Sequence, residues 1–380
     1  MYQEEKWIWQ HKNYPNFNFD RSLISHLICD VARKNGKLEG ILISIDKSDT
    51  NFLEFETTTE EIVGSSQIEG ELLNRDSVRS SILKKFDKLT GVKDSSTQHT
   101  DGLVTMFLDS SNNHKPLTHE RLYGWHNVLF PGGYSGLYKI DVAMYRTQEI
   151  SVVSQKHEKE KIHYTAPPPS VVYKEMEEFL NYVNTNKDDP YIKAAVAHLW
   201  FLTIHPFDDG NGRIARAITN YILSKELQMK HTHYSISTVI AYEKKNYYEL
   251  LENTQKLLRN KELNILSWIE WHTKMIGNAI DRSLKHVKKV LDKTLFWDRA
   301  RVYTLNQRQL KVLNKLLDAG ENGFEGGLSA KKYISITKTS IATAKRDISD
   351  LVEKGLIVKL AGSAGRNTRY ILHLVRNSQK

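Results

Sequence analysis

The chain has 380 residues, of which 40% are hydrophobic and 26% are charged, and it contains one cysteine, Cys29. This composition indicates a folded globular protein of two or three domains and argues against an intrinsically disordered chain. A single cysteine excludes an intramolecular disulfide framework, and the sequence has neither a membrane-length apolar stretch nor a secretory signal, so we expect a cytoplasmic protein with no membrane partner.

The net charge of +9 comes from the C-terminal part of the chain. Residues 301–380 contain 15 Lys and Arg residues against 6 Asp and Glu residues, whereas the first 300 residues contain 39 of each class. Such an excess is consistent with binding to nucleic acid through phosphate contacts, and equally with a solvated basic face.

Residues 1–95 are expected to form an N-terminal helical domain. They begin with an aromatic segment that contains Trp7, Trp9, Tyr14, Phe17 and Phe19. A helix is predicted from the candidate N-cap Asp20 to a stop at Gly36, and a second helix is predicted within about 55–75.

Residues 96–280 are expected to form a mainly helical core with one interruption. Residues 150–169 have β-branched side chains on both sides of a polar tip, QKHEKEK, and they end in Pro167–Pro169, which cannot continue a helix. We predict a β-hairpin here; from this pattern alone, a plain surface loop is an equal alternative.

Two apolar helices joined by a short polar turn are predicted inside this core. Residues 191–205, YIKAAVAHLWFLTIH, are apolar on nearly every face, which is typical of a helix buried within a domain. The turn PFDDGNGR follows, and after it comes a second apolar helix, IARAITNYILSKEL.

The turn contains residue types that can bind a polyphosphate. Gly210 and Gly212 can adopt positive φ, which would let consecutive backbone N–H groups converge on an anion next to a helix N-terminus. Arg213 and Arg216 lie one helical turn apart and can clamp phosphate oxygens. A plain helix–helix connector and a solvated arginine pair are the alternatives when each feature is taken singly.

Two further side chains suggest chemistry at the same place. Asp209 can supply an oxygen ligand to a divalent cation that also binds phosphates. His205, at the end of the first buried helix, can act as a general base near neutral pH. A lone histidine at a helix end is more often structural, so the prediction rests on the whole set within twelve residues.

The segment HPFDDGNGRIAR, residues 205–216, resembles the Fic signature H-x-F-x-(D/E)-G-N-G-R-x-x-R at every specified position. The segments GLYKIDVAMY (136–145), TAPPP (165–169) and NYYELLENT, together with the predicted hairpin, are similar to segments that flank the signature in this family. The resemblance covers most of residues 55–270 and, more loosely, the aromatic N-terminal segment. It implies a mainly α Fic fold with a β-hairpin flap.

The resemblance also implies an activity, that of a protein adenylyltransferase. Such an enzyme moves AMP from ATP, with Mg²⁺, to a Ser, Thr or Tyr hydroxyl of a target protein and releases pyrophosphate. His205 would take the proton of that hydroxyl, Asp209 would bind Mg²⁺, and Phe207 would fix the turn. The other implied nucleotide contacts are Gly210, Asn211, Gly212, Arg213 and Arg216 at the phosphates, and Tyr247 or Tyr248 at the base.

Other activities stay open at this point. Family members that transfer phosphate replace the second glycine–arginine portion of the signature, whereas this chain keeps Gly212 and Arg213. A nucleotide-sensing transcriptional regulator with little turnover and an enzyme that removes AMP are further alternatives. A homodimer and self-modification are also open.

Residues 65–70, SSQIEG, resemble the inhibitory motif (S/T)-x-x-x-E-(G/N) that precedes the core in one class of Fic proteins. Its specified residues are Ser65, Glu69 and Gly70. A glutamate beside Arg216 would form a charge-assisted pair in the space that the γ-phosphate needs, so Glu69 is expected to restrain activity. The alternative is a surface helix acid.

The last part of the chain is predicted to be a helical connector, residues 281–300, followed by a domain at 301–380 that resembles a winged helix. In its main helix, one shared face is predicted for Ile341, Ala344, Ile348, Leu351 and Val352. If it binds DNA, the residues expected in the major groove are Thr339, Ser340, Thr343, Lys345 and Arg346, with Arg366 and Arg369 on phosphates. A protein-docking module is the alternative.

Overall fold

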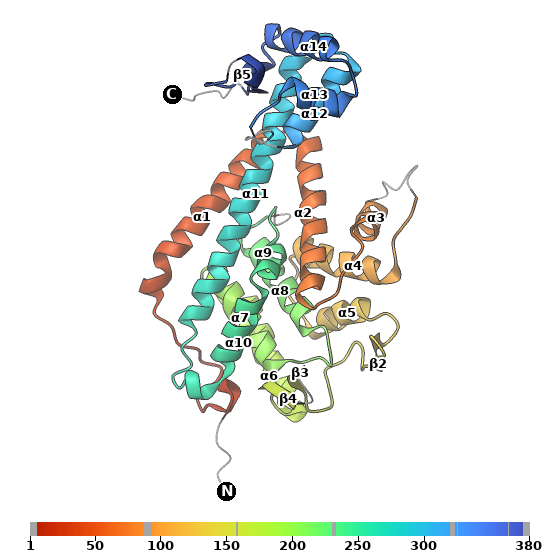
Figure 1. Ribbon diagram of the computed structural model, residues 1–380. Helices are drawn as coiled ribbons and strands as arrows, with labels where there is room; N and C mark the ends of the chain where they lie inside the picture. Colours follow the sequence, from red (N-terminus) through yellow and green to blue (C-terminus); the bar gives the residue numbers. More distant parts are fainter. Residues whose placement is uncertain are drawn as a thin grey trace. The chain divides into compact units, whose positions relative to one another are not determined.

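The computed structural model describes residues 6–86, 93–156, 159–229, 233–319, 324, 326–363 and 365–374. The side chains of residues 155–160 and of Arg366 are not described. The predicted hairpin tip around His157 and the predicted phosphate contact of Arg366 therefore lie outside the described residues. The chain divides into two compact units, Met1–Ser283 and Leu284–Lys380 (Figure 1).

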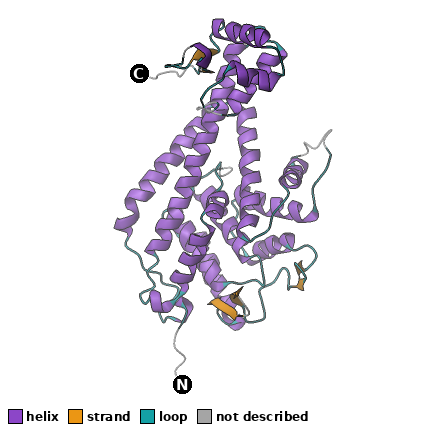
Figure 2. Ribbon diagram, in the orientation of Figure 1, coloured by secondary structure: helices purple, strands orange, loops and turns teal. Residues whose placement is uncertain are grey.

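The first unit consists mainly of helices, with short antiparallel hairpins (Figure 2). Its helices and short 3₁₀ segments are η1 (Ile8–Gln10), α1 (Arg21–Ser44), α2 (Lys47–Ile68), α3 (Arg75–Lys85), α4 (Gln98–Asn112), α5 (His119–Leu129), α6 (Pro169–Thr185), α7 (Pro190–Ile204), α8 (Asn211–Glu226), α9 (Ile236–Tyr242), α10 (Lys244–Gln255), η2 (Leu257–Arg259) and α11 (Leu266–Ala300), which continues into the second unit. Its strands are β1 (Tyr134–Ser135), β2 (Tyr138–Lys139), β3 (Ser151–Lys156) and β4 (Lys159–Thr165). The predicted mainly α fold and the predicted β3–β4 hairpin are both confirmed.

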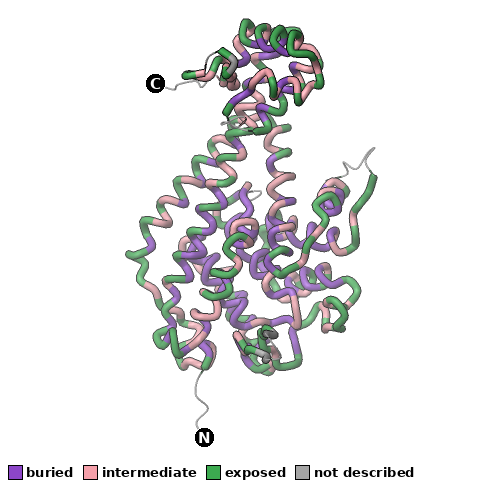
Figure 3. Tube along the Cα trace, in the orientation of Figure 1, coloured by how far each residue is buried: buried purple, intermediate pink, exposed green. Residues whose placement is uncertain are grey.

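The centre of this unit is the pair α7 and α8. Residues 191–204 of α7 are all buried, and α8 is buried from residue 213 to residue 224 (Figure 3). The continuous apolar sequence of α7 leaves no face for water, so other helices must cover it on every side. The turn between α7 and α8 is therefore fixed at both ends by buried helices.

The predicted stop of the first helix at Gly36 is wrong. The helix α1 continues through Gly36 to Ser44, and both Leu38 and Leu42 are buried beyond that point. A glycine inside a helix costs about 1 kcal/mol relative to alanine, which the burial of two leucines outweighs.

Helix α2 docks closely on α9, and this contact fixes the position of its C-terminal end. A Cβ at Gly64 would come within 2.7 Å of the backbone nitrogen of Thr238, so only glycine permits this approach. Nearby, the buried carboxylate of Glu61 accepts hydrogen bonds from the Ser235 hydroxyl (2.8 Å) and from the backbone and hydroxyl of Ser237. A buried charge with this many donors resists separation of the two helices.

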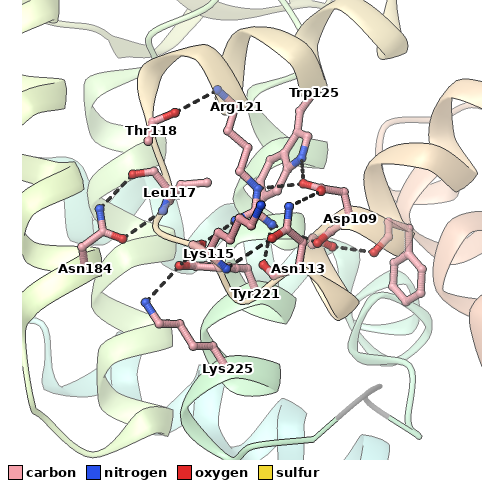
Figure 4. Close-up of polar contacts among 12 residues, drawn as sticks. Asp109, Asn113, Lys115, Leu117, Thr118, Arg121, Trp125, Asn184, Tyr221 and Lys225 are labelled. Carbon is pink, nitrogen blue, oxygen red and sulfur yellow. Dashed lines mark hydrogen bonds and ion pairs between the residues drawn. The ribbon is translucent and has the colours of Figure 1, made fainter.

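A polar joint fixes α5 against the end of α4 (Figure 4). Arg121 donates to the carboxylate of Asp109 (2.7 Å) and to the carbonyl oxygens of Asp109, Asn113 and Lys115. Trp125 donates to the same Asp109 carboxylate at 2.7 Å. Arg121 thus gives a charged donor to carbonyl groups at and just after the end of α4, and the joint fixes α5, which carries His126, against α4.

The second unit has a core of its own. After the end of α11 it contains α12 (Gln307–Asp318), α13 (Ala330–Thr337), α14 (Ile341–Glu353), β5 (Ile357–Lys359), η3 (Gly365–Asn367) and β6 (Tyr370–Leu372). The predicted order of helix, short element, helix and two strands is confirmed, and β5 pairs with β6 in antiparallel register.

The predicted shared face of α14 is only partly correct. Ala344, Ile348 and Leu351 are buried in the core of the second unit, but Ile341 and Val352 are 58% and 39% exposed. Ile341 is the first residue of the helix, and Ser340 is its N-cap. The first turn therefore projects beyond the surface that buries the middle of the helix.

Replacing Arg121 with Met should lower the free energy of unfolding of the first unit by about 2 kcal/mol, because Asp109 and several carbonyl oxygens lose their charged donor. Hydrogen exchange of peptides from α4 and α5 in increasing urea measures this change. Arg33→Met is the matched control, since Arg33 is 77% exposed and pairs only with Asp30 of its own helix among the described residues. Equal protection in the two variants would contradict the role given to Arg121.

Candidate active site

The turn between α7 and α8 reverses the chain through two residues in the left-handed conformation. His205 caps α7 with φ +52°, and Gly210 precedes α8 with φ +80°. Phe207 lies between them and is fully buried. A left-handed histidine is uncommon outside sites where surrounding contacts enforce it.

The side chain of Asn211 closes this turn. Its Oδ1 accepts from the backbone N–H of Phe207 (3.0 Å), and its Nδ2 donates to the carbonyl of Phe207 (2.8 Å). Asn211 is 2% exposed. The resemblance suggested that this side chain helps to cradle phosphates; its amide is instead engaged with the turn itself.

Gly212 leaves the space that the Glu69 carboxylate occupies and has no special backbone conformation. We expected positive φ at both glycines, but only Gly210 adopts it, and Gly212 lies within the first turn of α8. A Cβ at this position would collide with Oε1 of Glu69 and would come within 3.3 Å of Nη1 of Arg216.

Arg146 holds the outer side of the turn, and sequence reasoning missed it. It is 2% exposed and donates from Nε to the carbonyl of His205 (2.7 Å) and from its backbone N–H to the carbonyl of Pro206 (2.9 Å). Its remaining N–H groups reach the carbonyl oxygens of Gln148, Pro167 and Ile204. The signal available in the sequence was its position directly after the segment 136–145.

His126 of α5 supports the inner side of the turn, and it too was missed. Its ring stacks on Phe207 with centroids 4.3 Å apart. Nδ1 accepts from the backbone N–H of Ala143 (3.2 Å), so Nε2 carries the hydrogen and donates to the carbonyl of Asp209 (3.2 Å). Burial lowers the pKa of His126 to about 4, which keeps this arrangement neutral.

His205 is held as a neutral imidazole with one free lone pair. Burial lowers its pKa to about 4. Nδ1 lies 3.3 Å from the carbonyl oxygen of Leu202, which can only accept, so Nδ1 carries the hydrogen. Nε2 is then the basic atom.

Asp209 offers a carboxylate next to the helix N-terminus. One oxygen accepts from the hydroxyl of Ser135 in β1, and the other accepts from the backbone N–H of Gly210 at 2.5 Å. Among the described residues, no group of three or more His, Cys, Asp or Glu side chains could hold a metal ion. A metal at Asp209 would therefore need ligands from a bound molecule or from water.

The C-terminal end of α2 lies against Arg216. Arg216 donates from Nη2 to Oε1 of Glu69 at 2.6 Å, and it also donates to the hydroxyl and carbonyl oxygens of Ser65 at 2.9 and 3.0 Å. Arg216 is 3% exposed. Gly70 follows with φ +88° and ends the helix. The structure thus brings Ser65, Glu69 and Arg216 together.

A cavity of about 590 Å³ opens beside the turn. It is bounded by the turn, the hairpin β3–β4, α10 and the end of α2, and its lining includes Glu69, His205, Asp209, Gly212, Tyr247 and Tyr248. Tyr247 is buried, and its hydroxyl lies 3.1 Å from Nε2 of His198, whereas Tyr248 is 38% exposed and donates to the carbonyl of Ile68. Tyr247 and Tyr248 therefore form the part of the cavity lining that α10 contributes next to the end of α2.

A cluster of charges joins the hairpin to α10. Glu252 lies 2.6 Å from Nδ1 of His163 in β4, and Lys161 and Lys256 also pair with it. Burial opposes ionisation of Glu252, but these partners outweigh it and lower its pKa to about 2. The cluster fixes one wall of the cavity.

The residues predicted to contact DNA belong to the second unit. Lys345 and Arg346 are exposed on α14, and Arg369 is partly buried beside β6. The site around His205 contains none of them. No helix among the described residues combines the length and the apolar character that a membrane crossing requires.

Comparison with known proteins gives two family matches. Residues 116–223 match the Fic/DOC family, and residues 7–87 match a domain of unknown function (DUF4172). Among curated relatives, the protein adenylyltransferase fic-1 of Caenorhabditis elegans is 34% identical over 65 residues, which is 16% of this chain and 13% of that protein. The probable protein adenylyltransferase aq_aa38 of Aquifex aeolicus is 39% identical over 61 residues, 16% of this chain and 19% of that protein. The chain thus spans less than a fifth of each of these relatives.

Solved structures show the same fold at low identity. A Fic family protein from Desulfovibrio desulfuricans has a TM-score of 0.53 and 17% identity, over 91% of this chain and 95% of that chain. A Fic domain containing signaling protein from Bacteroides thetaiotaomicron has a TM-score of 0.52 and 19% identity, over 68% of this chain and 97% of that chain. At this identity they show the fold alone, and the match to the Fic/DOC family covers the domain at residues 116–223, which contains α7, the turn and most of α8.

Proposed function

We propose that the chain is a protein adenylyltransferase that moves AMP from ATP to a hydroxyl of a protein target and that Glu69 restrains this activity. The observation that carries the proposal is that the imidazole of His205 lines the same cavity as the N-terminus of α8. A base and an anion-binding helix end in one cavity are the two components that nucleotidyl transfer to a hydroxyl requires.

In this reaction the target oxygen attacks the α-phosphorus of ATP. A new P–O bond forms to the target, the bond between the α-phosphorus and the bridging oxygen breaks, and pyrophosphate leaves. The hydroxyl proton passes to Nε2 of His205. The hydrogen bond from Nδ1 to Leu202 fixes the tautomer and aims the lone pair.

The phosphates would bind at the first turns of α8. The free N–H groups there favour anions, and the Arg213 and Arg216 guanidinium groups add positive charge. Nε of Arg213 and Nη1 of Arg216 are buried without a hydrogen-bond partner among the described residues. Buried donors of this kind gain most from an incoming anion.

Asp209 fits a magnesium ion bound together with the phosphates. Magnesium commonly takes one or two carboxylates and completes its shell with phosphate oxygens and water. When bound, it would neutralise charge on the phosphates during transfer. Ser135 and Gly210 orient the carboxylate for this contact.

The hairpin β3–β4 is suited to receive the target. It is a two-stranded sheet with exposed apolar residues, Val152, Val153 and Ile162, at 38%, 43% and 45% exposure. An extended target segment could pair with the outer edge of such a sheet and bring its hydroxyl to the cavity.

Glu69→Gly should raise incorporation of label from α-labelled ATP into protein by at least about ten-fold, because the loss of one partly buried charge pair frees Arg216 for phosphate. Label from γ-labelled ATP should stay at background. Adding His205→Ala should abolish transfer and leave ATP binding nearly unchanged.

Gln67→Gly is the matched control for this experiment, since it weakens the same last turn of α2 at an exposed position. It should leave incorporation at the wild-type level. Label from the γ position would indicate a phosphotransferase, and binding without any transfer would indicate a nucleotide sensor; either result would overturn the proposed reaction.

The His205 imidazole should remain neutral down to about pH 5.5 in the nucleotide-free protein, because burial lowers its pKa to about 4. Below that range it takes up a proton, and the base is lost as pH falls. Proton–nitrogen correlation spectra of the histidine rings should show hydrogen on Nδ1 and none on Nε2, with His205→Ala providing the assignment. A titration midpoint above pH 6 would contradict this arrangement.

We propose DNA binding as a second function, located in the second unit. It is supported by Lys345 and Arg346, which are exposed on α14 of a winged-helix-like order of elements. Lys345→Ala combined with Arg346→Ala should weaken binding to duplex DNA. Arg369→Ala, at the residue expected on phosphate, should reduce the salt dependence of that binding by about one phosphate contact. Fluorescence anisotropy at several salt concentrations measures both. No binding by the intact chain at low salt would remove this function.

A further inference from the structure

The chain reverses directly after α2, and this reversal brings a second carboxylate toward α8. The N–H of Glu71 donates to the carbonyl of Ser66 (2.9 Å), and the N–H of Gly70 donates to that of Gln67 (3.0 Å). Gly70 has φ +88°, the left-handed conformation that such a helix ending requires. Glu71 is therefore turned back past the helix end.

Glu71 lies between a histidine and a signature arginine. Its Oε2 is 3.6 Å from Nη1 of Arg213, and its Oε1 is 2.7 Å from Nε2 of His99 in the first turn of α4. His99 lowers the pKa of the Glu71 carboxyl, against an opposing effect of burial, and Arg213 lowers it further. Glu71 is thus a charged neighbour of Arg213, and its carboxylate is held by α4 through His99 and by α8 through Arg213.

The two arginines of the signature therefore have separate carboxylate partners. Glu69, directly before Gly70, pairs with Arg216 at 2.6 Å, and Glu71, directly after it, pairs with Arg213 at 3.6 Å. Arg213 is itself 7% exposed and lies over the ring of Phe130 at 5.0 Å, which limits its freedom to turn elsewhere. An anion that approaches Arg213 must compete with Glu71.

We propose that Glu71 is a second restraining residue, which competes with the terminal phosphates of ATP for Arg213 as Glu69 does for Arg216. His99 positions its carboxylate. This inference rests on the proposed function for the identity of the anion, a nucleoside triphosphate. Because the competition concerns the terminal phosphates, it discriminates between ATP and AMP.

Calorimetric titration of the full chain with Mg²⁺ and a non-hydrolysable α,β-methylene analogue of ATP tests this inference, with AMP as the second ligand. Glu71→Gln should tighten binding of the ATP analogue by about five-fold, the range expected for loss of one partly exposed charge pair. It should leave AMP binding within about two-fold of wild type. In the Glu69→Gly background, Glu71→Gln should lower KM for ATP with little change in kcat.

Glu177→Gln is the matched control, because it removes the same charge from an exposed position on α6. It should change neither affinity. Unchanged binding of the ATP analogue by Glu71→Gln, or equal tightening of the analogue and AMP, would overturn the role of Glu71. If Glu71→Gln tightens the analogue selectively but Glu69→Gly transfers no AMP, Glu71 keeps its role and the proposed reaction fails instead.

Discussion

The side chain of Asn211 and its two hydrogen bonds to Phe207 are the contact on which the site depends. A chain that reverses inside a protein leaves backbone N–H and carbonyl groups away from water, and each needs a partner. Asn211 pairs with the backbone N–H and carbonyl groups of Phe207 inside the turn. Arg146 donates to the carbonyl groups of His205 and Pro206 on its outside. Only with these partners can His205 remain in its left-handed conformation and face the cavity.

The restraint proposed for Glu69 and Glu71 depends on how firmly α2 is held. Moving α2 away would strip Glu61 of its donors on α9 and open the close approach at Gly64. Exposing or unpairing a buried carboxylate costs several kcal/mol, whereas rotating one glutamate side chain costs far less. Release of Arg216 is therefore easier through rotation of Glu69 than through departure of the helix, and the same holds for Glu71 and Arg213.

The sequence predicted the parts of the site that are local in the chain. His205, Asp209 and the arginines lie within twelve residues, so their spacing alone brings them together. The pair of Glu69 with the distant Arg216 was predicted only because residues 65–70 resemble a known motif. Arg146, His126 and Glu71 also contact distant segments, but no motif marked their roles. The wrong predictions for α1 and α14 have the same origin, packing between distant segments. Burial extends α1 past Gly36, and Ile341 is exposed because the first turn of α14 lies beyond the core.

Gly212 shows how one position can serve both the restrained and the active state that we propose. Its backbone is helical, so any residue could adopt its conformation, yet a side chain there would collide with the Glu69 carboxylate. The space that Glu69 occupies lies directly above the first turn of α8, where the N–H groups of the helix attract negative charge. A carboxylate and a phosphate both need the same two features: backbone N–H groups that no side chain covers, and a nearby arginine. The proposed restraint therefore depends on a likeness in charge and position between the Glu69 carboxylate and the phosphate that it would exclude.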